Sequence, residues 1–87
     1  MAITSADGWA AVCVGPDGYS LEPLCFWHEN ELGHVYGEVA HGLAETTSVR
    51  ELAMFHGYVK LDHVTQADRQ RWVQLSRRMR EQWEAAE

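Results

Sequence analysis

Short apolar runs separated by turn residues fill the first half of the chain. Residues 9–14 are apolar and rich in β-formers, and they end at the Gly-Pro-Asp-Gly sequence of residues 15–18, where Pro fixes φ and Gly accepts a positive φ. Residues 21–29 and 34–40 are again extended in character, with a short polar loop between them. The pattern predicts a three-stranded antiparallel sheet.

The second half changes to helical spacing. Ser48 and Glu51 form a capping box, and apolar or aromatic-type positions then recur at i, i+3, i+4 and i+7 as Val49, Leu52, Ala53 and His56. Gly57 is a suitable stop for a helix. We therefore expect a short helix of about two turns here.

A long helix is expected at the C-terminal end. Thr65 and Asp68 form a second box-like start, and no Gly or Pro follows, so the helix can run nearly to Glu87. Its apolar residues recur at spacings of 3, 4, 4 and 3 and make one stripe: Trp72, Leu75, Met79, Trp83 and Ala86. The prediction for residues 1–87 is a single α+β domain, with a strand-rich half 1–45 and a helical half 46–87 in which the long helix packs on the sheet.

Alternation assigns the strand residues to two faces. Leu24, Phe26, Val35 and Val39 are placed beneath the long helix, which leaves an outer face with aromatic and acidic side chains. Exposed aromatics ringed by one sign of charge are typical of protein-binding surfaces. The predicted partner-binding residues are Trp27, Glu29, Tyr36 and Glu38. Two alternatives stay open: one of the aromatics turns inward, or a homodimer buries this face.

Charge is divided unequally along the chain. Residues 1–45 carry seven acidic residues and no Lys or Arg, a net charge of −7, whereas residues 46–87 carry seven basic and six acidic residues, a net of +1. An acidic surface of this kind favours a partner with a basic surface, such as a host protein that handles nucleic acid.

No set of residues has the spacing of a catalytic or metal site. Cys25 and His28 have ligand-like spacing, but on a strand an offset of three points them to opposite faces. A Cys-His nucleophile pair lacks a third orienting group, and the glycines do not form a phosphate-binding loop. We therefore expect no enzyme activity, no metal and no cofactor.

The arginines of the long helix raise DNA binding as the alternative function. At 100° per residue Arg69 and Arg80 lie on one flank of the apolar stripe while Arg71 and Arg78 lie on the other, so they form no single basic face. Arg77 and Arg80 also have acidic residues four positions later. Direct nucleic-acid binding is disfavoured, and a small DNA-binding regulator using the arginine-bearing helices remains the second hypothesis.

The stripe of the long helix is more hydrophobic than a three-stranded sheet of this size covers. A two-fold pairing of C-terminal helices would cover it on both copies at once. The sequence predicts a homodimer interface formed by Trp72, Met79 and Trp83. The competing interpretation places both tryptophans in the core of one chain.

A cytoplasmic protein is expected. No apolar run approaches the roughly 18 residues that a membrane helix needs, and residues 1–7 have neither the basic nor the apolar part of a signal peptide. Cys13 and Cys25 are too few for a disulfide scaffold, and we expect free thiols in a reducing compartment.

The order of turn and strand signals resembles the opening of small uncharacterised proteins encoded by phages and prophages of high-GC bacteria. The resemblance covers about the first 40 residues, and it is carried by Gly8-Trp-Ala-Ala-Val, Asp17-Gly18, Glu22-Pro-Leu24, Trp27 and Gly33-His-Val-Tyr-Gly37. It implies an accessory protein, such as an inhibitor of a host or defence component, and it assigns no catalytic or binding residue.

Overall fold

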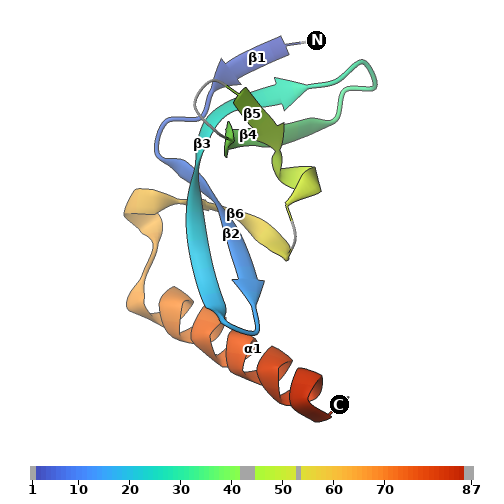
Figure 1. Ribbon diagram of the computed structural model, residues 1–87. Helices are drawn as coiled ribbons and strands as arrows, with labels where there is room; N and C mark the ends of the chain where they lie inside the picture. Colours follow the sequence, from blue (N-terminus) through green and yellow to red (C-terminus); the bar gives the residue numbers. More distant parts are fainter. Residues whose placement is uncertain (1, 42–44, 53, 86–87) are drawn as a thin grey trace.

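A computed structural model describes residues 2–41, 45–52 and 54–85. Within these ranges the chain forms six strands, two single-turn 3-10 helices and one long α-helix (Figure 1). In chain order they are β1 (Ala2–Ser5), β2 (Trp9–Gly15), β3 (Gly18–Glu29), β4 (Val35–His41), β5 (Glu45–Ser48), η1 (Val49–Glu51), β6 (Phe55–Lys60), η2 (Leu61–His63) and α1 (Gln66–Ala85). Ala53, Ala86 and Glu87 belong to the predicted helical patterns and lie outside the described residues.

The strands form one antiparallel sheet in the order β5-β4-β3-β2-β6, with β1 paired to β3. Strand β3 is long enough to pair with different strands along its two halves. Its residues 18–23 pair with β2, whereas residues 24–29 pair with β4 on one side and residues 26–29 pair with β1 on the other. β1 and β2 therefore follow one another along the same edge of β3, and β3 links the two ends of the molecule (Figure 1).

The predicted three-stranded sheet with a short and a long helix is wrong. The three expected strands are present as β2, β3 and β4, but the described residues form a six-stranded sheet, and no short α-helix precedes α1. His56 and Gly57, expected at the end of that helix, lie in β6, which pairs along β2 from Trp9↔Lys60 to Cys13↔Phe55. Pairing with a strand more than 40 residues earlier overrides the local helical spacing.

A single turn replaces the predicted short helix. Ser48 ends β5, η1 lasts three residues, and the Thr47 hydroxyl donates to the Glu51 carboxylate at 3.1 Å. Met54 then has a φ of 66°, the left-handed conformation that a non-Gly residue adopts mostly in turns. Its carbonyl accepts from the Val14 N–H, so this turn delivers the chain into the edge position beside β2.

Strand β2 is buried on both faces, which explains its continuous apolar run. On one face Val12 and Val14 pack with Trp72 in a helix-side core, which half-buried side chains of β3, β6 and α1 surround. On the other face Ala11 belongs to an aromatic core, whose buried members are Ala6, Ala11, Leu24, Val39 and Val49. The partly buried side chains packed against this second core are Trp9, Trp27, Tyr36, Leu52, Phe55 and Tyr58.

Helix α1 packs on the sheet, but not on the predicted face. It contacts β2 and the first half of β3, where Trp72 is 2% exposed, whereas Val35 of the predicted face is 57% exposed. The expected N-terminal box is present, since Asp68 N–H donates to the Thr65 hydroxyl and Thr65 N–H donates to the Asp68 carboxylate. The Ser76 hydroxyl donates to the Gly15 carbonyl and ties the middle of α1 to the β2–β3 turn.

Candidate protein-binding surface

A one-residue bulge in β3 decides which side chains face outward. Leu24 pairs with Val39 and Phe26 pairs with Glu38, so Cys25 is an extra residue with no partner on β4. Beyond the bulge the alternation is shifted by one residue. Trp27 therefore shares a face with Leu24, and the prediction that groups Phe26 with Leu24 is wrong.

Trp27 lies in the aromatic core. It pairs with Gly37, and its ring makes edge contacts with Trp9, at a centroid distance of 5.8 Å, and with Tyr58, at 4.7 Å. The Tyr58 hydroxyl accepts a hydrogen bond from the Gly37 N–H at 2.8 Å. A Cβ at Gly37 would lie 2.7 Å from the Leu24 side chain, so any larger residue here would have to displace that side chain. The part of this face around Trp27 and Gly37 is thus covered by protein, whereas Glu29 and Val35 at the end of the hairpin are exposed.

Tyr36 belongs by its pairing to the face opposite Trp27, in a row that crosses three strands, and its half-buried side chain also touches the aromatic core. Ile3 pairs with His28 and His28 pairs with Tyr36, so their side chains project from the same side of β1, β3 and β4. The His28 and Tyr36 rings are 5.1 Å apart and tilted by 41°. Ile3 is 68% exposed and Tyr36 is half-buried, which makes this row a flat, partly aromatic strip.

The loop between β3 and β4 continues the strip and is held in shape by one side chain. The Asn30 side-chain oxygen accepts from the N–H groups of Leu32 and His34, at 2.9 and 3.0 Å, and Gly33 supplies the positive φ of the turn. This turn presents Leu32, which is 80% exposed. A hollow of about 330 Å³ lies between the loop and the strip, lined by His28, Asn30, Glu31, Leu32 and Tyr36.

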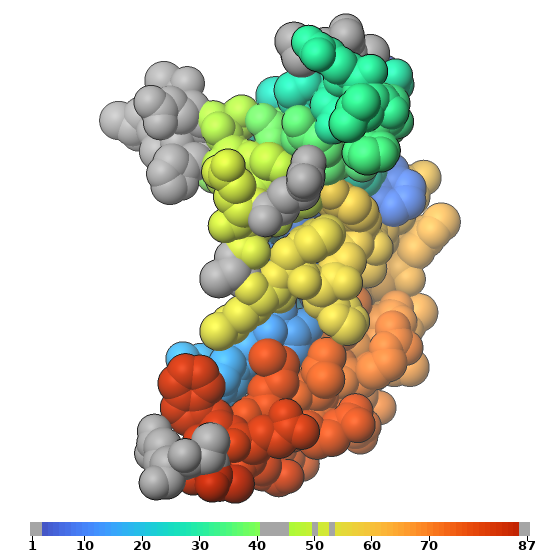
Figure 2. Space-filling model, turned by 90° about the vertical axis from the view of Figure 1, so that its right-hand side faces the viewer, coloured from blue at the N-terminus to red at the C-terminus, as the bar shows by residue number. Residues whose placement is uncertain are grey.

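We call Ile3, His28, Glu31, Leu32 and Tyr36 the hairpin surface. It occupies the end of the molecule remote from α1, with the green β3–β4 hairpin and the orange-to-red helix at opposite ends of Figure 2. Ile3 and Leu32 are exposed at this end, and Val35 at the start of β4 is exposed on the opposite face, where it pairs with Glu29.

The two predicted acidic residues are divided between the two faces. Glu38 shares the face of Tyr36, where one carboxylate oxygen lies 3.5 Å from the Thr46 hydroxyl that donates to it and the other is buried without a hydrogen-bond partner. Glu29 is exposed and, by its pairing with Val35, lies on the face of Trp27. The structure thus brings Tyr36 and Glu38 together and separates both from Trp27 and Glu29.

The sequence pattern does not place Ile3, His28 or Leu32 on the predicted binding surface. Leu32 gave a usable signal, because a large apolar residue inside a polar turn is seldom covered by its own chain. Ile3 gave none, since residues 2–5 have no distinctive pattern and become β1 only through their pairing with β3.

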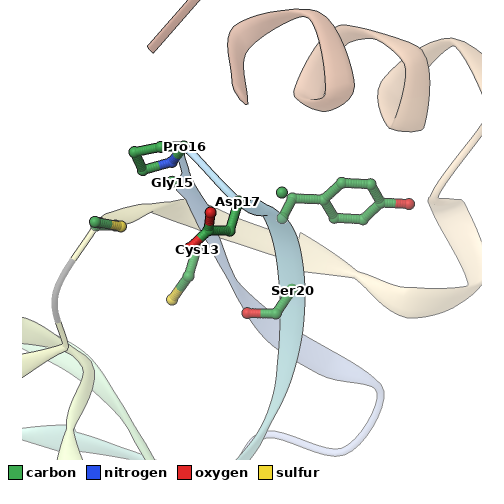
Figure 3. A pocket seen from close by; sticks show the side chains of 8 residues that line it. Cys13, Gly15, Pro16, Asp17 and Ser20 are labelled. Carbon is green, nitrogen blue, oxygen red and sulfur yellow. The ribbon is translucent and has the colours of Figure 1, made fainter. Parts of the chain in front are cut away.

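A second hollow lies at the β2–β3 turn and offers little chemistry. It measures about 300 Å³, and Figure 3 shows Cys13, Pro16, Asp17 and Ser20 around it. Burial raises the pKa of the Cys13 thiol, and the nearby Glu22 carboxylate raises that pKa further. A protonated thiol is a poor nucleophile, and no His or Lys lines this hollow to activate it.

The predicted dimer residues differ in their exposure. Trp72 fills the core of its own chain, with its ring 5.2 Å from that of Tyr19, and Met79 is half-buried against the same core. Trp83 is 61% exposed and lines a hollow of about 390 Å³ with Pro16 and Met54. Of the three, Trp83 offers the largest free surface.

The arginines of α1 make contacts that differ from the predicted pairs at i and i+4: one is within the helix and two reach the β2–β3 turn and the start of β3. Arg71 pairs with Asp68 at 2.8 Å, Arg69 donates to the Tyr19 hydroxyl at 3.0 Å, and Arg80 donates to the Pro16 carbonyl at 2.9 Å. Within the described part of the chain α1 is the only α-helix. The short helix expected before α1 is missing from these residues, so α1 has no second α-helix there with which to form a DNA-binding pair.

The described residues hold no group of three or more His, Cys, Asp or Glu side chains placed to bind a metal ion. Their helices include none with the length and apolar character needed to cross a bilayer. Comparison of the chain with protein-family models, with curated proteins and with solved structures finds no match.

Proposed function

We propose that this chain is a non-catalytic protein-binding module that docks its hairpin surface onto a basic surface of a cytoplasmic partner protein. The observation that carries the proposal is that Ile3 and Leu32, which are 68% and 80% exposed, lie beside the His28 and Tyr36 rings at one end of a small domain. Large apolar side chains grouped in this way are typical of surfaces that a partner covers.

The hairpin surface is held rigid before any partner arrives. Backbone pairing across β1, β3 and β4 holds the row of Ile3, His28 and Tyr36, and the two hydrogen bonds to Asn30 hold Leu32. A surface that is already ordered loses little conformational entropy on binding, so its apolar contacts contribute more of their free energy to affinity.

Charge supports a basic partner. The hairpin surface includes Glu31, shares its face with Glu38, and belongs to a 45-residue segment without Lys or Arg. A single sign of charge accelerates encounter with a surface of the opposite sign. Protein surfaces that hold nucleic acid have that sign, and a module docked there blocks them, which agrees with the inhibitory accessory role that the phage resemblance implies.

Capture with matched baits tests the proposal. The baits are the unaltered chain, a Leu32→Ser/Tyr36→Ala variant of the hairpin surface, and Val73→Ser, which removes an exposed apolar side chain of α1. Extracts of high-GC bacteria are passed over each bait at about 0.15 M and about 1 M salt, and retained proteins are quantified by mass spectrometry.

We expect one basic protein to be retained by the unaltered chain and by Val73→Ser, to be lost from the hairpin variant, and to be weakened by high salt. Its association rate with the purified chain should fall with added salt. Equal retention on all three baits, or loss with Val73→Ser alone, contradicts docking through the hairpin surface.

A further inference from the structure

One side of α1 and Tyr19 line an open hollow of about 530 Å³. Its lining includes Arg69, Val73 and Arg77, together with three glutamine side chains. We call Tyr19, Arg69, Val73 and Arg77 the arginine groove. Neither the hairpin surface nor the hollow at the β2–β3 turn extends to Val73 or Arg77.

The two arginines stand on either side of an apolar centre. Arg69, Val73 and Arg77 follow one another at i, i+4 and i+8 and form one row along the helix, which separates the two arginines by about 12 Å along its axis. Val73 lies midway and is 44% exposed.

Both arginines keep their charge available. The Tyr19 hydroxyl that accepts from Arg69 is neutral, so it holds the guanidinium in place without compensating its charge. Arg77 forms no ion pair with any residue in the described ranges, and Arg71 is the arginine of α1 that pairs with a carboxylate there. The groove is a positive site on a chain whose net charge is −6.

The tip of the β3–β4 hairpin has the complementary pattern. Leu32 is the most exposed large apolar side chain of the described residues, at 80%. The exposed Glu31 precedes it in the loop, and the exposed Glu29 ends β3 on the other face of the hairpin. An apolar centre beside two carboxylates matches an apolar centre between two guanidinium groups, and arginine binds carboxylates through several directed hydrogen bonds.

We propose that the arginine groove binds the hairpin tip of a second copy of this chain, with Leu32 of one copy against Val73 of the next. The groove and the tip lie at opposite ends of a molecule 43 Å long, so one chain cannot satisfy both (Figures 1 and 2). Such a head-to-tail contact leaves a free groove at one end and a free tip at the other, and it produces open chains. The contact is small, so the association is weak and reversible.

Self-association and partner docking compete, because Glu31 and Leu32 belong to both contacts. The proposed self-association uses part of the hairpin surface but does not depend on the partner proposed for it. A change confined to the arginine groove separates the two, since it removes self-association and leaves the hairpin surface intact.

Reciprocal charge reversal tests the contact. The tip variant carries Glu29→Arg and Glu31→Arg, and the groove variant carries Arg69→Glu and Arg77→Glu. Average mass is measured by sedimentation velocity over about a hundred-fold concentration range at about 0.15 M salt, where contact pairs persist and longer-range repulsion between like-charged copies is screened. Helical circular dichroism confirms that each variant is folded.

We expect the mass of the unaltered chain to rise above 9.9 kDa with concentration and each variant alone to stay at its monomer mass. An equimolar mixture should associate again, because each basic tip then meets an acidic groove and each acidic tip meets a basic groove. Arg77→Glu alone should weaken association, whereas Arg78→Glu, the same charge change on the neighbouring residue, should leave it unchanged.

An unaltered chain that stays at 9.9 kDa throughout, or a mixture that fails to associate, overturns the inference. Association that survives both variants and disappears with Trp83→Ala overturns it in favour of a two-fold pairing of C-terminal helices. If the groove variant captures a basic partner but the unaltered chain does not self-associate, this inference alone is overturned. If the unaltered chain self-associates but captures no basic partner, the proposed function alone is overturned.

Discussion

The two cores on either side of β2 are built in different ways. The helix-side core has one large fully buried side chain, Trp72, against the small side chains of Val12 and Val14. The aromatic core has no single centre, because its buried members are small or medium-sized and four half-buried rings share contacts: Trp9, Trp27, Phe55 and Tyr58.

The two cores hold their elements together in different ways. The aromatic core joins strands that also share backbone hydrogen bonds, so the loss of one ring leaves other contacts in place. The helix-side core instead attaches α1, which among the described residues has no backbone pairing with the sheet, through side chains of which Trp72 is the one large and fully buried member. We infer that substitutions in the helix-side core have the larger and more localised effects.

Removal of the Trp72 ring should break this attachment. Trp72→Ala leaves a cavity where the side chain is 2% exposed, and we expect the free energy of unfolding to fall by about 3–5 kcal/mol. Chemical denaturation measures the loss, with Trp83→Ala as control, because that ring is 61% exposed and its removal should cost only about 0.5 kcal/mol. Equal losses would contradict the assignment of Trp72 as the anchor of α1.

A change of one atom probes the aromatic core. Tyr58→Phe keeps the ring contacts with Trp27 and Phe55 but removes the oxygen that accepts from the Gly37 N–H, and we expect a loss of about 1–3 kcal/mol. Hydrogen exchange at the Gly37 amide should accelerate in parallel. Tyr19→Phe is the control, since its hydroxyl meets the exposed Arg69. Unchanged exchange at Gly37 would show that another group satisfies this amide.

The capping box at the start of α1 should contribute less to the free energy of unfolding than Trp72 does. Thr65→Ala removes the hydroxyl that accepts from Asp68 N–H, and we expect a loss of about 1 kcal/mol, measured by chemical denaturation. A loss as large as that of Trp72→Ala would mean that capping, and not packing, fastens the helix.

The capping box of Thr65 and Asp68 also makes the stability of the chain depend on pH. The Thr65 N–H, then the Thr65 hydroxyl and Arg71, lower the pKa of Asp68 from its ordinary 3.8. Because the folded pKa is the lower one, the stabilisation is complete above the unfolded pKa and is lost as pH falls through the folded value. The difference in stability between the unaltered chain and Asp68→Asn should therefore be largest near neutral pH and shrink below pH 3.8.

The reactivities of the two thiols report on the structure of β2 and of the β3 bulge without any change of sequence. Burial, and secondly the Glu22 carboxylate, raise the pKa of Cys13, whereas Cys25 is exposed in the bulge of β3. With iodoacetamide at about pH 8 we expect Cys25 to react first, and both residues to react alike in denaturant. Peptide mass spectrometry reports each site. Equal rates in the folded chain would show that the β2–β3 turn opens readily.

The part of the fold that the sequence predicts is the part set by local signals. Alternation and the Gly-Pro-Asp-Gly turn locate β2, β3 and β4, and the Thr65 and Asp68 pair locates the start of α1. Strand β6 escapes prediction because residues 49–56 have helical spacing, and only the pairing of Phe55–Lys60 with β2 decides against it. Such pairing depends on residues far away in the sequence.

The candidate site shows the same division. Tyr36 and Glu38 are placed on one face by simple alternation within β4, which is unbroken. Trp27 is misplaced because the alternation in β3 is interrupted at Cys25, a residue that carries no sequence mark of a bulge. The role of Trp27, Glu29, Tyr36 and Glu38 in partner binding stays a prediction.

The bulge at Cys25 determines which face of the hairpin each side chain beyond it occupies. A chain of the same length that lost the bulge would exchange the two faces beyond Cys25, turning Trp27 outward and His28 inward. In-frame loss of the Cys25 codon would instead bring Phe26 directly after Leu24, in the register that they already have, and keep both faces as they are. Related chains that are one residue shorter at this position should therefore display the same side chains without a bulge, whereas a change of length by one residue later in β3 would replace the whole displayed set in a single event.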